Sequence, residues 1–149
     1  MVSFDTNVLV YATASISDEK VTRARELIVR ALRATSSVLL LQTLAEFSHV
    51  AIRKAKIPVE DVRRIIDVWR AALPVQAADT SDLLMALEAV RAHRLAFWDA
   101  MLWATAQRAG VRCLLTEDLQ DGFALQGVAF INPFKRQNDQ LIDEVLPPS

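Results

Sequence analysis

Short apolar runs alternate with longer amphipathic segments along the whole chain. The runs predict buried strands, and they cover residues 2–4, 38–41, 75–77, 113–115 and 128–131. Their nearly continuous apolar character is typical of parallel strands that are covered on both faces. Apolar residues at helical spacing predict helices over about residues 21–32, 44–51, 58–73, 83–90 and 98–109. The alternation of strands and helices therefore predicts βαβ units and an α/β fold with a parallel sheet.

The pattern also predicts two additions to this alternation. Two helices separate the second strand from the third, which predicts a helical hairpin that stands off the sheet. After Pro133 the sequence carries a weak helical pattern in Leu141, Ile142, Val145 and Leu146. This tail is either a packing helix or an appendage that binds a partner. No repeat or linker interrupts the pattern, so we expect a single domain over residues 1–149.

Composition and charge limit the classes of function. The chain has 149 residues, of which 52% are hydrophobic and 23% are charged, as in an ordinary globular domain. A net charge of −1 gives no broad basic surface, so binding of nucleic acid would require local patches, cations or a partner. The single cysteine, Cys113, cannot form an internal disulfide, and no stretch is apolar for long enough to cross a membrane. We therefore expect a cytoplasmic protein without membrane contact.

Three groups of helical residues are expected to be structural. The helix around 21–32 carries arginines mostly off its apolar stripe: Arg23, Arg25, Arg30 and Arg33. They predict a solvated face, and the alternative is that part of it contacts phosphate. The helix around 83–90 carries an apolar stripe: Leu83, Leu84, Leu87 and Val90. The tryptophans also occupy apolar helical positions, which predicts core or interface residues: Trp69, Trp98 and Trp103.

Four acidic residues occupy positions that the strand and helix order brings to one edge of the sheet. Asp5 ends the first strand, and Glu46 lies in the first turn of the helix after the second strand. Asp99 opens the helix that leads into the fourth strand, and Asp118 closes that strand. In a parallel α/β sheet, helix N-termini and strand C-termini lie at the same edge, which is where such sheets bind ligands. The sequence therefore predicts a carboxylate site there.

Each of these acids also has a structural interpretation. Glu46 and Thr43 have the spacing of a capping box, and Asp5 could cap the next helix through an Asx turn. Asp99 lies where the helix dipole favours a negative charge, and Asp118 could be a simple turn residue. Four separate caps that converge on one edge are a less economical explanation than one shared purpose.

A divalent cation would supply that purpose. Clustered carboxylates repel one another, and a bound ion of charge +2 relieves the repulsion. Oxygen ligands with little histidine and one cysteine favour Mg²⁺ or Mn²⁺ over zinc. Such a site can polarise a phosphodiester, activate water and stabilise the leaving oxygen. The acids are therefore candidates for the catalytic groups of a phosphodiesterase.

The segments around these acids resemble the motifs of PIN-domain nucleases. Residues 2–11, which contain Asp5-Thr6-Asn7, are similar to the opening strand and Asp-Thr-Asn motif of that family. Residues 42–47 are similar to the segment of its conserved glutamate, and residues 97–102 and 115–122 to those of its third and fourth acids. The motifs occur in order over nearly the whole chain, and together they look like a VapC-type toxin of a bacterial toxin–antitoxin pair.

The resemblance implies a fold, an activity and partners. The fold would be a three-layer α/β/α arrangement with a central five-stranded parallel sheet. The activity would be that of an endoribonuclease that uses Mg²⁺ or Mn²⁺ and a metal-activated water. The partners would be an RNA substrate, a small antitoxin and a second copy of the chain in a homodimer. An RNA-maturation nuclease and a catalytically lapsed PIN-like binding module are the alternatives.

The resemblance also implies roles for individual residues. The metal ligands and catalytic groups would be Asp5, Glu46, Asp99 and Asp118. Thr116 would be an accessory hydroxyl that positions water or a carboxylate, and Asp121 is a candidate to extend the site. Thr6 and Asn7 would shape the turn and brace the acids. Glu117 and Asp121 could equally well face solvent.

Overall fold

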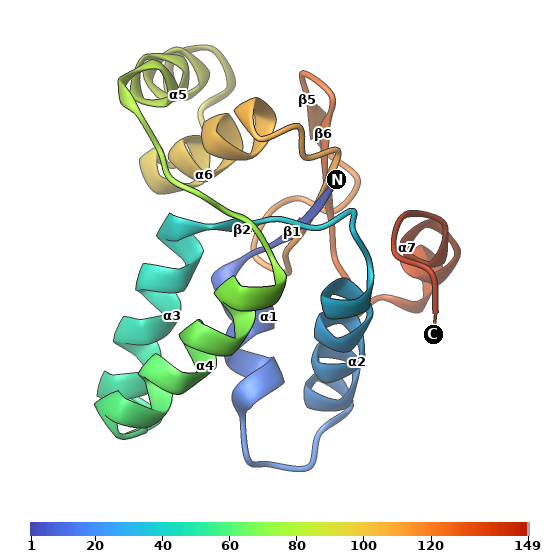
Figure 1. Cartoon of the computed structure of the whole chain (residues 1–149). Coiled ribbons are helices and arrows are strands. Elements are labelled where there is room, and N and C mark those ends of the chain that lie inside the picture. The colour runs from blue at the N-terminus through green and yellow to red at the C-terminus, as the bar shows by residue number, and fades with distance from the viewer. Residues whose placement is uncertain (149) are drawn as a thin grey trace.

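Six strands form the sheet region in the part of the chain that the structure describes. The computed structural model describes residues 1–148 and is shown in Figure 1. The strands are β1 Val2–Phe4, β2 Leu39–Leu40, β3 Val75–Gln76, β4 Cys113–Leu115, β5 Ala124–Leu125 and β6 Val128–Ile131. The main sheet has the order β1-β4-β6-β5, and β2 pairs with β3 beside it. Backbone hydrogen bonds between Val2 and Val38 (3.0 Å) and between Val2 and Ser36 (2.8 Å) join the two sheets.

The predicted α/β fold with parallel strands is confirmed, but the strand count of its central sheet is wrong. All five apolar runs form strands, and each pairs in parallel with a neighbour. The main sheet holds four strands rather than five, because β2 and β3 form their own pair. Its edge strand β5 is antiparallel to β6 and was not predicted. The two join through Gln126 and Gly127, whose positive φ angles of 45° and 84° suit a tight hairpin turn.

In residues 1–148, seven α-helices cover both faces of the strands, which gives three layers. They are α1 Thr6–Thr13, α2 Glu19–Arg33, α3 Leu41–Arg53, α4 Val59–Ala72, α5 Thr80–His93, α6 Phe97–Arg108 and α7 Asp139–Val145. A 3-10 turn, η1 (Arg136–Asn138), precedes α7. Side chains of β4 alternate between two cores: Cys113 and Leu115 join the core with α1 to α4 and α7, and Leu114 joins the core with α5 and α6. This alternation explains why an almost wholly apolar run makes a strand buried on both faces.

The hairpin (α3 and α4) and the tail (α7) both pack onto the core that also contains α1 and α2. Helices α3 and α4 lie side by side and extend away from β2, as predicted (Figure 1). The rings of Phe47 and Trp69 contact each other across the hairpin at 5.0 Å between centroids. In the tail, Ile142 and Leu146 are fully buried, so α7 is a packing helix. Within residues 1–148 no helix combines the length and the apolar character that crossing a membrane requires.

The arginine face of α2 is not simply solvated. The Arg30 side chain is only 6% exposed, and it pairs with Glu26 and with Asp143 of α7. Arg23 pairs with Asp139, also of α7, at 2.8 Å. These arginines therefore attach the tail to α2, which the helical pattern of α2 alone could not reveal because the partners are more than 100 residues away.

Two apolar helices differ from a simple core pattern. Trp69 and Trp103 are buried, as predicted for core residues, whereas Trp98 is 64% exposed, which excludes the core and leaves the predicted interface role. On α5 the leucines Leu83, Leu84 and Leu87 are exposed. Apart from Asp82 at its start, the residues that α5 buries are small, Ala86 and Ala89, and small side chains let its backbone approach α6 closely.

Candidate active site

Asp5 lies at the N-terminus of α1, directly after β1, and is 8% exposed. One carboxylate oxygen accepts a hydrogen bond from the Thr6 amide at 2.7 Å. The other accepts from the Thr116 hydroxyl, which is itself buried, at 2.7 Å. Asp5 therefore does cap a helix, as the structural interpretation of the sequence proposed. Capping uses one of its oxygens, and the second points to the loop after β4.

Glu46 lies in the second turn of α3 and not in the first, because the helix already begins at Leu41. Its carboxylate accepts hydrogen bonds from the Thr6 hydroxyl at 2.9 Å and from the Gln42 amide at 3.0 Å. The capping box with Thr43 is not formed, because the Thr43 hydroxyl donates to the Leu40 carbonyl instead. Glu46 is thus turned toward the start of α1 rather than toward its own helix end.

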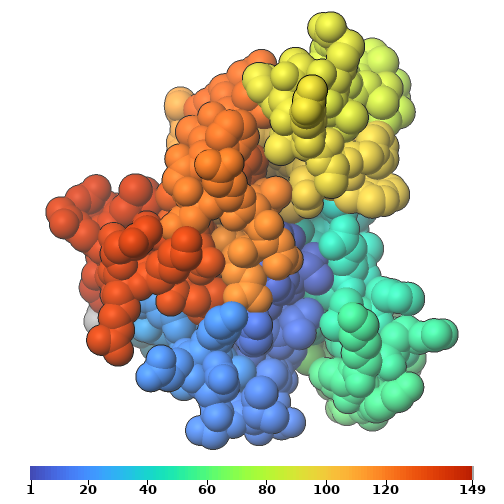
Figure 2. Space-filling view, turned by 180° about the vertical axis from the view of Figure 1, so that it is seen from behind, coloured from blue at the N-terminus to red at the C-terminus, as the bar shows by residue number. Residues whose placement is uncertain are grey.

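Asp118 and Asp99 complete the group from the loop after β4 and from the first turn of α6. The Asn7 amide donates to the Asp118 carboxylate at 2.9 Å, and the Asp118 backbone amide donates to the Thr116 hydroxyl at 3.2 Å. Within residues 1–148 the Asp99 carboxylate accepts no hydrogen bond. Figure 2 shows this face of the molecule, where the dark blue, teal and orange segments meet.

The charges of Glu46 and Asp118 act on both Asp5 and Asp99. Burial raises the pKa of Asp5 above its ordinary range, and the charges of Asp118 and Glu46 add to that rise. The Thr116 and Thr6 hydrogen bonds oppose the rise without cancelling it. Burial also raises the pKa of Asp99, and the charges of Asp118 and Glu46 again add to the rise. No Lys, Arg or His in the described chain forms an ion pair with any of the four, so their repulsion is uncompensated.

The chemistry of this donor set fits a hard divalent cation. Carboxylate and amide oxygens are the ligands that Mg²⁺ and Mn²⁺ prefer, and no carboxylate oxygen of the four acids accepts more than one hydrogen bond from residues 1–148, so each keeps a lone pair for a ligand. The Asn7 side-chain oxygen is buried and accepts no hydrogen bond from residues 1–148, so it too is available to a cation or water. As the side chains stand, the described residues contain no group of three His, Cys, Asp or Glu arranged to hold an ion. Hydrogen bonds orient Asp5, Glu46 and Asp118 without closing a ligand shell.

Two further acids near Asp118 are bound elsewhere. Asp121 accepts hydrogen bonds from the Asn132 amide at 2.8 Å and from the Asn138 side chain at 2.9 Å. Those bonds and Lys135 lower its pKa below the ordinary range. Glu117 accepts from the Tyr11 hydroxyl at 2.9 Å and pairs with Lys20. The structure therefore does not bring Asp121 to the four carboxylates, and it remains only a prediction that Asp121 extends the site.

Sequence reasoning missed Gln42 as part of the site. Its side-chain amide donates to Glu46 and also to the backbone carbonyl of Trp98 at 3.0 Å, so it links α3 to α6. The signal that could have found it is its position four residues before Glu46, on the same face of the helix. Thr6, Asn7 and Thr116, which were predicted as accessory residues, each bind a different acid: Glu46, Asp118 and Asp5.

Comparison with known proteins assigns the chain to a family. The PIN domain family matches residues 2–124, which is most of the chain, and the protein therefore belongs to the PIN domain family. Among curated proteins, none matches the chain significantly.

Three solved structures share the fold at low sequence identity. VapC20 of Mycobacterium tuberculosis, described as a toxin that cleaves the sarcin–ricin loop, has a TM-score of 0.63 at 15% identity, over 79% of this chain and 90% of its own. A toxin–antitoxin complex from Klebsiella pneumoniae has a TM-score of 0.67 at 17% identity, over 89% and 98%. FitAcB from Neisseria gonorrhoeae has a TM-score of 0.60 at 17% identity, over 90% and 99%. At these identities the likeness shows the fold alone.

Proposed function

We propose that this PIN-domain protein is a metal-dependent endoribonuclease that acts as the toxin of a toxin–antitoxin pair. The observation that carries the proposal is the group of four uncompensated carboxylates, Asp5, Glu46, Asp99 and Asp118, at one edge of the sheet. Burial and mutual repulsion raise the pKa of two of them, Asp5 and Asp99. Such repulsion is a cost to the folded protein unless a cation relieves it, and function is the reason to retain it.

The chain's own residues would hold the ion and orient its ligands. A bound Mg²⁺ or Mn²⁺ would polarise the scissile phosphodiester and make water a better nucleophile at neutral pH. Asp5, Glu46, Asp99 and Asp118 would provide the ligands. The Thr116 hydroxyl fixes the orientation of Asp5, and Asn7 fixes that of Asp118. Partners of this kind hold ligands in place and are worth a large part of the metal affinity.

An RNA strand would lie across this edge of the sheet. A groove of about 630 Å³ borders Glu46, and its lining is mostly apolar: Leu41, Ala45, Ala77, Trp98 and Met101. Trp98 directly precedes Asp99 in the sequence, and its indole is exposed. An unpaired base could therefore stack on it beside the phosphodiester. Because the chain carries a net charge of −1, the bound cation would supply part of the attraction for phosphate.

Two apolar surfaces support the proposed protein partners. A groove of about 450 Å³ between α1, α2 and α4 is lined by Ile28, Val29, Ile65, Val68 and Trp69, with Arg25 and Arg64 beside them. An antitoxin segment with apolar and acidic side chains would complement it. The exposed leucines of α5 would serve a homodimer. We also propose the cytoplasm as its location, where the buried thiol of Cys113, with a pKa raised to about 12, stays unreactive.

The test is RNA cleavage by purified protein with Mn²⁺, compared with Asp5→Asn. The substitution keeps an oxygen for the Thr6 amide, so the fold is expected to survive, and circular dichroism checks it. We expect Asp5→Asn to lower the cleavage rate at least about 100-fold, since loss of a ligand costs more than loss of its partner. Asp61→Asn on the exposed face of α4 is the matched control and should cleave like wild type.

Two results would contradict the proposal. Equal cleavage by wild type and Asp5→Asn would show a contaminating nuclease, and no cleavage by either would favour a lapsed binding module. Expression of the protein without a partner separates the remaining possibilities. A toxin stops growth, and the Asp5→Asn variant does not. Cleavage in vitro without any effect on growth would favour an RNA-maturation nuclease.

A further inference from the structure

The acid beside Asp118 is the centre of a small network that sequence motifs do not predict. Glu117, whose side chain is 19% exposed, accepts from the Tyr11 hydroxyl at 2.9 Å and from Lys20 at 2.6 Å. The Lys20 ammonium lies 5.4 Å from the Tyr11 ring centre and 5.5 Å from that of Phe134. The two rings contact each other edge to face at 5.2 Å. A cation held by two rings and one carboxylate has little freedom to move.

A second set of contacts holds the same loop at Asp121, three residues after Asp118. Asp121 accepts hydrogen bonds from the Asn132 amide and the Asn138 side chain, and it pairs with Lys135 at 3.3 Å. These partners belong to the segment between β6 and α7, as does Phe134. That segment lies outside residues 2–124, which the PIN domain family matches. The loop with Asp118 is therefore held before this residue by Tyr11 and Lys20, which both contact Phe134, and after it directly by the segment beyond the family match.

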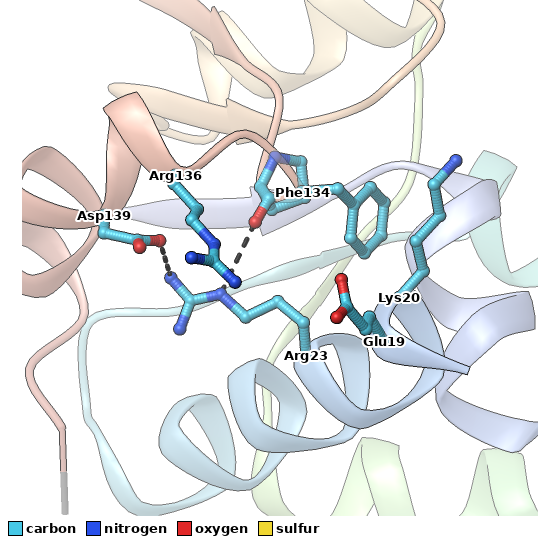
Figure 3. A pocket seen from close by; sticks show the side chains of 7 residues that line it. Glu19, Lys20, Arg23, Phe134, Arg136 and Asp139 are labelled. Carbon is cyan, nitrogen blue, oxygen red and sulfur yellow. Dashed lines mark hydrogen bonds and ion pairs between the residues drawn. The ribbon is translucent and has the colours of Figure 1, made fainter. Parts of the chain in front are cut away.

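The segment is itself fixed to α2. Figure 3 shows a pocket between them, where Lys20 and Arg23 of α2 stand beside Phe134 and Asp139. Arg23 donates to the Pro133 carbonyl at 3.4 Å and pairs with Asp139 at 2.8 Å. In Figure 2 the red C-terminal part lies against both the orange loop and the blue α2. Contacts thus run continuously from α2 through the segment to Glu117 and Asp121.

We propose that Lys20, Tyr11 and the segment 132–138 form a brace that positions Asp118 to bind the divalent cation. This proposal rests on the proposed function. Lys20 and Tyr11 are positioning residues, because they contact Glu117 and not the reacting groups. Among the described residues, Asp118 itself has only the Asn7 amide on its carboxylate and the Thr116 hydroxyl on its backbone amide. Without the brace the loop would be free to move Asp118 away from the other three acids.

The first test measures the brace without any metal. We compare amide hydrogen exchange in wild type, Lys20→Met, Lys20→Arg and the control Lys54→Met, which changes an exposed lysine at the end of α3. Lys20→Met should speed exchange at residues 117–121 about three- to tenfold, because local opening becomes easier, and leave β1 and β4 unchanged. Lys20→Arg keeps the charge and should exchange close to wild type. Unchanged exchange in Lys20→Met would overturn the brace.

The second test measures whether the brace acts through Asp118. Calorimetric titration should show a Mn²⁺ dissociation constant about three- to tenfold higher in Lys20→Met and in Tyr11→Phe, at the low end of losses seen for groups that support ligands. In an Asp118→Asn background the same substitutions should change Mn²⁺ affinity no further. An equal loss in that background would overturn the proposed route. Wild type that binds no Mn²⁺ would overturn the proposed function and with it the metal part of the brace, while the exchange result would still decide whether Lys20 holds the loop.

Discussion

Two buried aspartates of this protein, Asp82 and Asp5, have opposite surroundings. Asp82 is fully buried in the first turn of α5, where Arg108 of α6 binds it through two hydrogen bonds of 2.7 and 2.8 Å. The Asp79 amide adds a third at 2.9 Å. Asp5 is almost as buried, but its partners are a neutral hydroxyl and an amide, and its charged neighbours are other acids.

The pKa values record the difference. Arg108 holds the pKa of Asp82 below its ordinary value of 3.8, whereas burial and neighbouring acids raise that of Asp5. A buried charge with its own counter-ion has no need of anything from solution. A buried charge among like charges is relieved only by a proton or a cation. The comparison therefore separates an acid that joins two helices from an acid that awaits a ligand.

The largest expected effect comes from removing the counter-ion of Asp82. Arg108→Met leaves a carboxylate buried without a cation and should lower the melting temperature by roughly 5–10 °C. Differential scanning calorimetry measures the shift. The double variant Asp82→Asn, Arg108→Met should recover part of the loss, because no charge is left unpaired. A double variant less stable than the single one would show that Asp82 is not held by this ion pair.

Substitution of an acid that has no counter-ion should stabilise the protein instead. The Asp99 carboxylate accepts no hydrogen bond within the described residues and has a raised pKa, so its charge is a cost to the metal-free fold. Asp99→Asn should raise the melting temperature of metal-free protein by roughly 1–3 °C. Addition of Mn²⁺ should stabilise wild type and not this variant. If Asp99→Asn instead melts below wild type without metal, the repulsion between the acids is not a cost.

The smallest expected effect is on the pH dependence of the free energy of unfolding. A raised acid pKa means that the folded state binds more protons than the unfolded one above the ordinary value of 3.8. Asp5 and Asp99 therefore cost stability at neutral pH, and metal-free wild type should lose this cost as pH falls through their raised pKa values to the ordinary value of 3.8. Asp82 acts with the opposite sign, and its contribution is lost only below 3.8. Urea unfolding between pH 7 and pH 4.5 should show a smaller gain in Asp99→Asn than in wild type; equal gains would contradict this assignment.

The edge of the sheet that carries the acids could be predicted from sequence, because the order of strands and helices alone decides it. Strand ends and helix starts meet at one edge in any parallel α/β sheet, so Asp5 and Asp99 could be expected at the same edge. The nearly continuous apolar runs likewise identified the strands, including β4, whose side chains belong to two cores. Local patterns thus carry most of the layer structure.

Features that depend on distant partners could not be predicted in this way. Arg30 looked solvated, since its place on α2 says nothing about Asp143 of α7. Glu117 and Asp121 could not be separated from Asp118 by type or spacing, and only Tyr11, Lys20 and Asn132 show where they are bound. Trp98 is exposed because the groove beside Glu46 is left open by the elements around it. Helical spacing cannot show which face of a helix has no neighbour.

The most direct test of the central claim is a calorimetric titration of metal-free protein with Mn²⁺. Wild type and the control Asp82→Asn should both bind the ion saturably, and Asp5→Asn should bind it at least about 100-fold more weakly. That outcome would show that the acids without a counter-ion, and not buried acids in general, take up the cation. Binding that is absent in wild type, or equal in wild type and Asp5→Asn, would contradict the account.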